Sequence, residues 1–262
     1  YIMYDCEDAC DCFPGVHNDG GVCYFLWDKD YNGMIDYTFK SNKGIVNNSK
    51  IYLKNDYFEY VIRDNRILSI LDKASKDRKF SEIVSETKPY GIRKYLFNEP
   101  ERYPESNLQL KPFKNSVKIY GVKGVKGGAK RIIGYINKVS IIKNQKSIDK
   151  YKLFFTTSYS TNAINPPDTI IGLPNEVCTE TFLMVGHFDT EKEQTNCYNY
   201  INTDFFKTLL YYGKGTMQVT RSVFGLIPLQ DFKEDWTDEK LYKKYALEPK
   251  EIAFIESLVK LK

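Results

Sequence analysis

The residues most able to bind a metal ion are six cysteines, three of which lie close together near the start of the chain. Cys6, Cys10 and Cys12 are followed by His17, but no second Cys or His pair stands at zinc-finger spacing. Thiols packed in or near strands are commoner in an intracellular protein, and a structural disulfide is the least favoured alternative. We therefore predict no metal site in this chain.

Candidate catalytic residues are also few. With only two histidines, the chain has little material for a nucleophilic dyad, and we interpret His187 beside Asp189 as part of a surface turn. Asn165-Pro166-Pro167-Asp168 differs in its last residue from the Asn-Pro-Pro-aromatic motif with which adenine-specific DNA methyltransferases hold a flipped base. Asp168 cannot stack on a base and adds a negative charge, so we predict a rigid loop there and no catalytic residue.

A strongly basic segment covers residues 111–152, which carry a net charge of +11 in a chain whose net charge is +4. Such a segment attracts polyanions, because each phosphate that a lysine neutralises releases condensed counterions. Interleaved tyrosines and glycines favour this interpretation over a merely solvated surface, since glycines let a backbone approach a ligand closely. The basic residues are Lys111, Lys114, Lys118, Lys123, Lys126, Lys130, Arg131, Lys138, Lys143, Lys146, Lys150 and Lys152.

The elements that must position these residues alternate irregularly between strands and helices. An opening hairpin is predicted at residues 22–27, with both faces buried, and 34–39, joined by a turn at Asn32-Gly33. Later strands are predicted at residues 116–122, 152–156 and 177–185, and Pro166-Pro167 predicts an extended loop before residues 169–172. Helices are predicted at residues 63–75 and 191–212, followed by one capped by Thr237 and one beginning at Pro249. The order predicts an α+β fold, a mixed sheet with flanking helices, and loops at residues 79–109.

Composition adds limits on the class of protein. With 42% hydrophobic residues and 15% aromatic residues the chain resembles a globular protein, which excludes wholesale disorder. No apolar run approaches the roughly 18 residues of a membrane span, so we expect a cytoplasmic protein without a membrane partner. The first residue is Tyr1, and we expect the chain to be a fragment of a longer protein.

Several stretches, taken in order, resemble the C-terminal part of type II restriction–modification adenine methyltransferases of the large, fused kind found in bacteria. The opening strands resemble the last strand pair of the catalytic domain in that family, and the later stretches resemble its target-recognition domain. The matching stretches are residues 12–16 with 20–28, 83–85 with 88–91, 130–135, 156–160, 172–181, and 213–221 with 227–229.

The resemblance implies a target-recognition fragment rather than a complete enzyme. The glycine motif that binds the cofactor and the catalytic Asn-Pro-Pro-aromatic motif of the family are both missing from this chain. Residues 1–40 would be the terminal strands of a truncated methyltransferase domain, and residues 41–262 would recognise the DNA target. S-adenosylmethionine is expected only for the parent protein, and double-stranded DNA is the expected partner, with the missing methyltransferase domain or another subunit beside it.

The expected DNA-binding residues fall into two groups. Lys123, Lys126, Lys130 and Arg131 are predicted to contact phosphates, which position a duplex without reading its sequence. Arg93, Arg221 and Gln218 are predicted to read bases, together with Ser158, Tyr159, Ser160 and Thr161. The alternative for each is a surface salt bridge. An alternative function from another class is a subunit-docking module, with Trp236, Phe254, Ile255 and the terminal helices as its surface.

Overall fold

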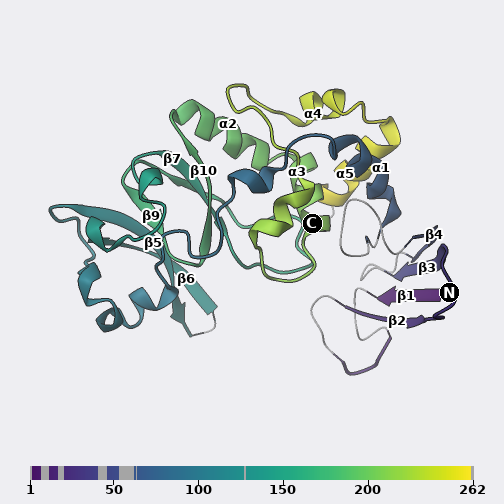
Figure 1. Ribbon diagram of the computed structural model, residues 1–262, viewed down its shortest axis with the longest axis horizontal. Helices are drawn as coiled ribbons and strands as arrows, with labels where there is room; N and C mark the ends of the chain where they lie inside the picture. Colours follow the sequence, from purple (N-terminus) through teal and green to yellow (C-terminus); the bar gives the residue numbers. More distant parts are fainter. Residues whose placement is uncertain are drawn as a thin grey trace.

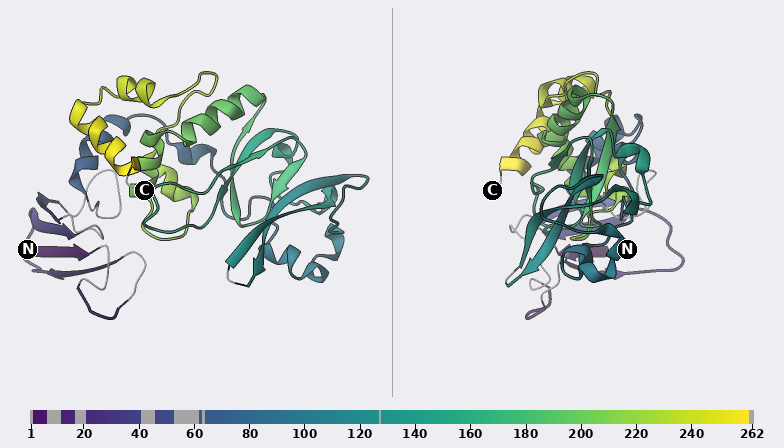
Figure 2. Two further views of the ribbon diagram at one scale, coloured as in Figure 1. Left: turned by 180° about the vertical axis from the view of Figure 1, so that it is seen from behind. Right: turned by 90° about the vertical axis from the view of Figure 1, so that its left-hand side faces the viewer.

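The computed structural model describes residues 2–6, 12–16, 21–40, 46–52, 62, 64–126 and 128–260. Three β-sheets and five α-helices make up the described part of the chain, which confirms the α+β fold (Figure 1). Two of the three sheets contain both parallel and antiparallel strand pairs and are mixed, as predicted, whereas the remaining sheet is antiparallel. The N-terminal sheet lies apart from the two other sheets, and the helices gather between them (Figures 1 and 2).

The N-terminal sheet has the strand order β2-β1-β3-β4. Its strands are β1 (Ile2–Cys6), β2 (Val22–Leu26), β3 (Ile35–Lys40) and β4 (Val46–Ile51), so it continues past residue 40. The predicted hairpin is wrong, because β1 lies between β2 and β3 and pairs with both. The prediction that residues 22–27 are buried on both faces is also wrong, because β2 is the edge strand and Phe25 is 58% exposed.

A disulfide joins Cys6 and Cys12 in this region. It corrects the prediction of free thiols, which ranked a disulfide last. Cys10 and His17 lie outside the described residues, and Cys23, Cys178 and Cys197 are free. A cysteine pairing depends on two side chains meeting in space, which the spacing alone does not determine.

The central sheet has the order β10-β7-β8, with β7 (Tyr151–Thr156), β8 (Ile170–Gly172) and β10 (Phe182–Phe188). Its buried side chains alternate between two hydrophobic clusters. Leu153 and Phe155 face one cluster, whereas Phe154 faces the other. Since successive side chains of a strand point to opposite faces, this sheet is covered on both sides.

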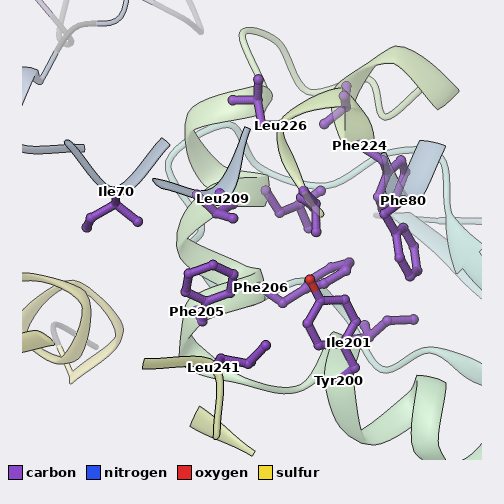
Figure 3. Close-up of a cluster of buried hydrophobic side chains, with 14 of the residues drawn as sticks. Ile70, Phe80, Tyr200, Ile201, Phe205, Phe206, Leu209, Phe224, Leu226 and Leu241 are labelled. Carbon is purple, nitrogen blue, oxygen red and sulfur yellow. The ribbon is translucent and has the colours of Figure 1, made fainter. Parts of the chain in front are cut away.

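The larger cluster joins the central sheet to the helices (Figure 3). The helices are α1 (Leu68–Ala74), α2 (Glu191–Ile201), α3 (Asp204–Gly213), α4 (Asp238–Lys244) and α5 (Pro249–Lys260). Phe80 stands at its centre, with ring contacts to Tyr200, Phe206 and Phe224. The predicted helix over residues 191–212 divides in two, because the Thr203 hydroxyl accepts from the N–H of Phe206 and starts α3.

The third sheet covers the other face, with the order β6-β5-β9. Its strands are β5 (Ser116–Val125), β6 (Gly128–Asn137) and β9 (Glu176–Cys178). The single strand predicted over residues 177–185 is wrong, since the chain turns at Thr179 and continues as β10 in the central sheet. Residues 79–109 contain only short 3-10 turns among the loops, as predicted: Phe80–Ile83, Lys94–Phe97, Pro100–Arg102 and Pro104–Ser106.

Candidate nucleic-acid interface

The β5–β6 hairpin leaves the hydrophobic core after Gly121, and its far end carries the predicted phosphate contacts. Val117 and Ile119 are fully buried, whereas every described residue from Lys123 to Arg131 is exposed. Lys123 and Lys130 stand directly opposite each other in the register, and Lys126 belongs to the turn. Like charges directly opposite on two strands are destabilising, so this arrangement favours an anion as the missing partner.

Other cations of the basic segment have internal partners instead. Lys118 pairs with Glu176 at 2.9 Å, Lys138 pairs with Asp149 at 2.8 Å, and Lys150 pairs with Asp189. Lys152 is fully buried and donates to the backbone carbonyls of Ser147 and Ile148. The +11 charge of residues 111–152 is therefore not all presented to a partner. What the segment does present includes Lys123, Lys126 and Lys130, none of which has an ion pair among the described residues.

Arg131 lies on the other face of the hairpin from Lys123 and Lys130. Its guanidinium donates to the carbonyl of Asp168 at 2.6 Å and lies 6.0 Å from the centre of the Phe182 ring. Asp168 is the last residue of the Asn-Pro-Pro-Asp motif, so the loop predicted there helps to hold Arg131. The guanidinium of Arg131 is thus held in place by Asp168 and Phe182. Because Arg131 is also exposed, its charge remains accessible to a partner.

The turn at Thr179–Thr181 connects the hairpin to the other predicted residues. The N–H of Thr179 donates to the Tyr120 carbonyl at 2.9 Å, next to the start of the free hairpin end. The N–H of Glu180 donates to the carbonyl of Ile92 at 2.9 Å, and Ile92 precedes Arg93. Thr157, which precedes Ser158, donates to the Thr181 carbonyl at 3.0 Å. The turn therefore brings together Ile92, Tyr120 and Thr157, which are far apart in the sequence, where the third sheet meets the central sheet.

The polar loop after β7 is joined to the predicted Gln218. Ser158 and Gln218 form an antiparallel bridge, flanked by hydrogen bonds from the N–H of Tyr159 to Met217 and from the N–H of Val219 to Thr157. Ser158, Ser160 and Gln218 are exposed, so their side chains are available to a partner. The structure thus brings together three of the predicted base-reading residues.

Tyr159 and Thr161 are less accessible than their neighbours. Tyr159 is only 8% exposed, and the ammonium of Lys214 lies 3.4 Å from the centre of its ring. The hydroxyls of Tyr159 and Thr161 are buried without a hydrogen-bond partner in the described structure. Direct base reading by Tyr159 is therefore not supported, because its ring is covered by Lys214.

Lys214 is a residue that the sequence analysis missed. It is 4% exposed, donates to the Ser160 carbonyl, and has no carboxylate partner among the described residues. Burial lowers the pKa of Lys214 to about 7. No signal in the sequence marks this lysine, since the flanking Gly213 and Gly215 are equally typical of an exposed loop.

The two arginines predicted to read bases differ. Arg93 is exposed and has no ion pair among the residues that the structure describes, so it is free to contact a partner. Arg221 donates to the Ser81 carbonyl at 2.9 Å and to Glu86 at 3.0 Å, which matches its salt-bridge alternative. Arg221 therefore holds two loops together before it meets any ligand.

The predicted docking surface of the terminal helices is largely internal. Ile255 is fully buried and Phe254 is 7% exposed, and both pack in the larger hydrophobic cluster. Trp236 is partly buried, with its indole N–H donating to the Asp231 carbonyl at 2.9 Å. These three side chains do not form an exposed docking surface, because α5 packs against α3.

The described residues contain no group of three or more His, Cys, Asp or Glu side chains arranged to hold a metal ion. His187 is exposed, and Asp189 forms its ion pair with Lys150, whose hydrogen bond holds the pKa of that carboxyl below its usual range. Within the described part of the chain, no helix is both long and apolar enough to cross a membrane. Comparisons with protein-family models, curated protein sequences and solved structures find no match to this chain.

Proposed function

We propose that this chain binds double-stranded DNA in a sequence-dependent way. The observation that carries the proposal is the free end of the β5–β6 hairpin, with its exposed and unpaired Lys123, Lys126 and Lys130. At about 3.3 Å per residue, the four residues from Val122 to Val125 extend about 13 Å beyond Gly121. The major groove of B-DNA is about 8.5 Å deep and wide enough for a two-stranded ribbon, so the hairpin end has the dimensions for insertion.

The neighbouring polar groups would supply sequence dependence. Lysine contacts to phosphates fix the register of a protein on DNA, whereas directional hydrogen bonds to base edges discriminate between sequences. Ser158, Ser160, Gln218 and Arg93 are exposed near the turn that anchors the hairpin. We assign base reading to these four residues and phosphate contacts to the hairpin lysines.

We further propose that the bound target is modified by a separate catalytic domain or subunit. The support is the ordered resemblance to adenine methyltransferases of restriction–modification systems, in which a flipped adenine receives a methyl group from S-adenosylmethionine. In this proposal the chain recognises the DNA target, while the partner binds the cofactor and carries out the methyl transfer.

Duplex binding by the full chain at increasing salt concentrations tests the DNA-binding function. Replacing Lys126 and Lys130 together by alanine should weaken binding and reduce the log–log salt slope by about 1.8, because each phosphate contact contributes about 0.9. The matched control replaces Lys111 and Lys114, two exposed lysines before the start of β5. No duplex binding by the unaltered chain, or equal losses in the two double variants, would contradict the proposal.

Base reading has its own measurement. Gln218→Ala should leave the salt slope unchanged and reduce the preference among a panel of duplexes, since Gln218 is assigned to base edges and not to phosphates. Loss of one bidentate base contact changes discrimination by about 1–3 kcal/mol. An unaltered preference together with a reduced slope would place Gln218 on the backbone of the duplex instead.

A further inference from the structure

A second feature is a cavity of about 710 Å³ between two loops, with Arg221 among the residues that line it. Residues 82–89 form one wall, residues 142–147 form the other, and Met184 of β10 contributes to the lining. The volume lies within the range of about 300–1,000 Å³ that is usual for sites of small organic ligands. None of the DNA contacts proposed above requires this space.

The cavity walls are held firmly in place. Ser85 and Met184 exchange hydrogen bonds, with the Ser85 N–H donating to the Met184 carbonyl at 2.8 Å and the Met184 N–H donating to the Ser85 hydroxyl at 2.9 Å. The side-chain amide of Asn144 donates to the Pro89 carbonyl at 2.6 Å, which ties the second wall to the first. The site is therefore built before any ligand arrives.

Three backbone irregularities lie in the segments that line this cavity. Lys88 has a φ of 58° and Asn144 a φ of 49°, and residues other than glycine adopt this left-handed region only at a cost. Strand β10 has a register shift between Val185 and Phe188, and Gly186, with a φ of 66°, lies within it. His187 follows Gly186 and lines the cavity, as expected of a bulge that redirects a side chain toward a site.

The charges that line the cavity leave an excess of cations. Its two carboxylates are both engaged by arginines: Glu82 accepts from Arg78, and Glu86 accepts from Arg221 at 3.0 Å. Lys88 lies 3.8 Å from Glu180. Lys143 and Lys146 are exposed and have no ion pair within the described part of the chain. These two lysines line the cavity without an internal carboxylate partner and are therefore available to bind an anion.

The lining between these cations is apolar. Ile83, Pro89, Ile142 and Met184 contribute to it, and Ile142 is 75% exposed beside Lys143. An exposed aliphatic side chain next to unpaired lysines fits a ligand with an apolar or planar body and an attached anion. We propose that the cavity binds a nucleotide through its 5′-phosphate, with the phosphate at Lys143 and Lys146 and the base against Ile142, Pro89 and Met184.

Calorimetric titration of the full chain with adenosine 5′-monophosphate tests this site. The nucleotide should bind, while adenosine and inorganic phosphate should each bind at least about tenfold more weakly, because each retains only half of the contacts. Replacing Lys143 and Lys146 together by alanine should weaken nucleotide binding at least about tenfold. The same Lys111/Lys114 double variant serves as the control, and thermal melting verifies that each variant is folded.

Absence of nucleotide binding at millimolar concentration, or equal weakening in the two double variants, overturns the proposal. The Lys126/Lys130 variant separates the two proposals, because it should lose duplex affinity and keep nucleotide affinity. The natural source of the phosphate is either a DNA end or a free nucleotide. To distinguish them, an oligonucleotide with a 5′-phosphate and the same strand without it are each tested for competition with adenosine 5′-monophosphate. Stronger competition by the phosphorylated strand indicates a DNA end, and equal competition indicates a free nucleotide.

Discussion

The two halves of the β5–β6 hairpin differ although they belong to the same pair of strands. In the first half buried and half-buried side chains alternate along β5, and Lys118 has a carboxylate partner in Glu176. In the second half the side chains are exposed, and Lys123 and Lys130 face each other without a carboxylate between them. The difference shows that a basic segment must be divided by its contacts before its charge is assigned to a partner.

The physical reason is the environment that each half meets. The first half packs against Phe97 and Phe154, where an unpaired charge would be costly, so its lysine is paired. The second half lies in water, where an unpaired lysine costs little and remains available. The following variants test this division, from the largest expected effect to the smallest.

Truncation of an aliphatic side chain should have opposite outcomes in the two halves. Ile119→Ala removes a fully buried side chain from the smaller cluster and should reduce the free energy of unfolding by about 2–5 kcal/mol. Val125→Ala, at a position that is 50% exposed, should change it by less than about 0.5 kcal/mol. Urea denaturation measures both, and a similar loss at both positions would remove the distinction between the halves.

Two glycines of β5, Gly121 and Gly124, allow a matched pair of Gly→Ala substitutions, each of which adds one methyl group. An added Cβ at Gly121 would lie 2.3 Å from Cε2 of Phe97, so Gly121→Ala should destabilise the protein by about 1–3 kcal/mol. At Gly124 nothing lies within 4 Å, and Gly124→Ala should be neutral or slightly stabilising. Melting temperatures of the two variants test this, and a stable Gly121→Ala variant would show that Phe97 moves freely.

Replacing a lysine by methionine should separate stability from binding. Lys118→Met leaves Glu176, which is 7% exposed, without its cation and should cost about 1–2 kcal/mol of stability with little effect on duplex affinity. Lys123→Met removes the like charge opposite Lys130, so it should leave stability unchanged or slightly higher, and it should reduce the salt slope of duplex binding by about 0.9. If Lys123→Met instead destabilises the fold, the lysine is structural.

The buried Lys214 should give the chain a pH-dependent stability. Its pKa is lowered by burial to about 7, so between pH 7 and the ordinary value near 10.5 the unfolded chain binds more protons than the folded chain. Stability from this group therefore rises with pH across that window, by at most about 1.4 kcal/mol per pH unit. Lys214→Met should flatten the dependence in denaturation series at pH 7, 8 and 9, and an unaltered dependence would contradict the assignment.

Much of the local structure could be predicted from the sequence. Thr237 caps α4, Pro249 starts α5, and the strand predicted at residues 152–156 is found at Tyr151–Thr156. Each of these signals lies within one turn or one strand, where backbone preference and capping are local effects. The polar loop at Ser158–Thr161 and the exposed lysines of the hairpin were also predicted as candidates.

The mistakes share a different cause. Residues 22–27 have the composition of a buried strand, but Tyr24 and Phe25, which point to opposite faces of β2, are 52% and 58% exposed, since burial depends on what packs against each face. Strands β9 and β10 are separated by a turn. In this turn the N–H of Phe182 donates to the Thr179 carbonyl at 3.2 Å. In the alternative function Phe254 and Ile255 would face a partner, but they pack inside, because α5 lies on α3.

The sequence by itself determined the α+β class, the starts of α4 and α5, and the concentration of positive charge in residues 111–152. Only the tertiary structure decided which of those charges are free, because Glu176 and Asp189 reach Lys118 and Lys150 from positions far along the chain. The cavity beside His187 also exists only through the approach of two distant loops. Periodicity and capping act over a few residues, whereas ion pairs and cavities depend on distances that the fold alone sets.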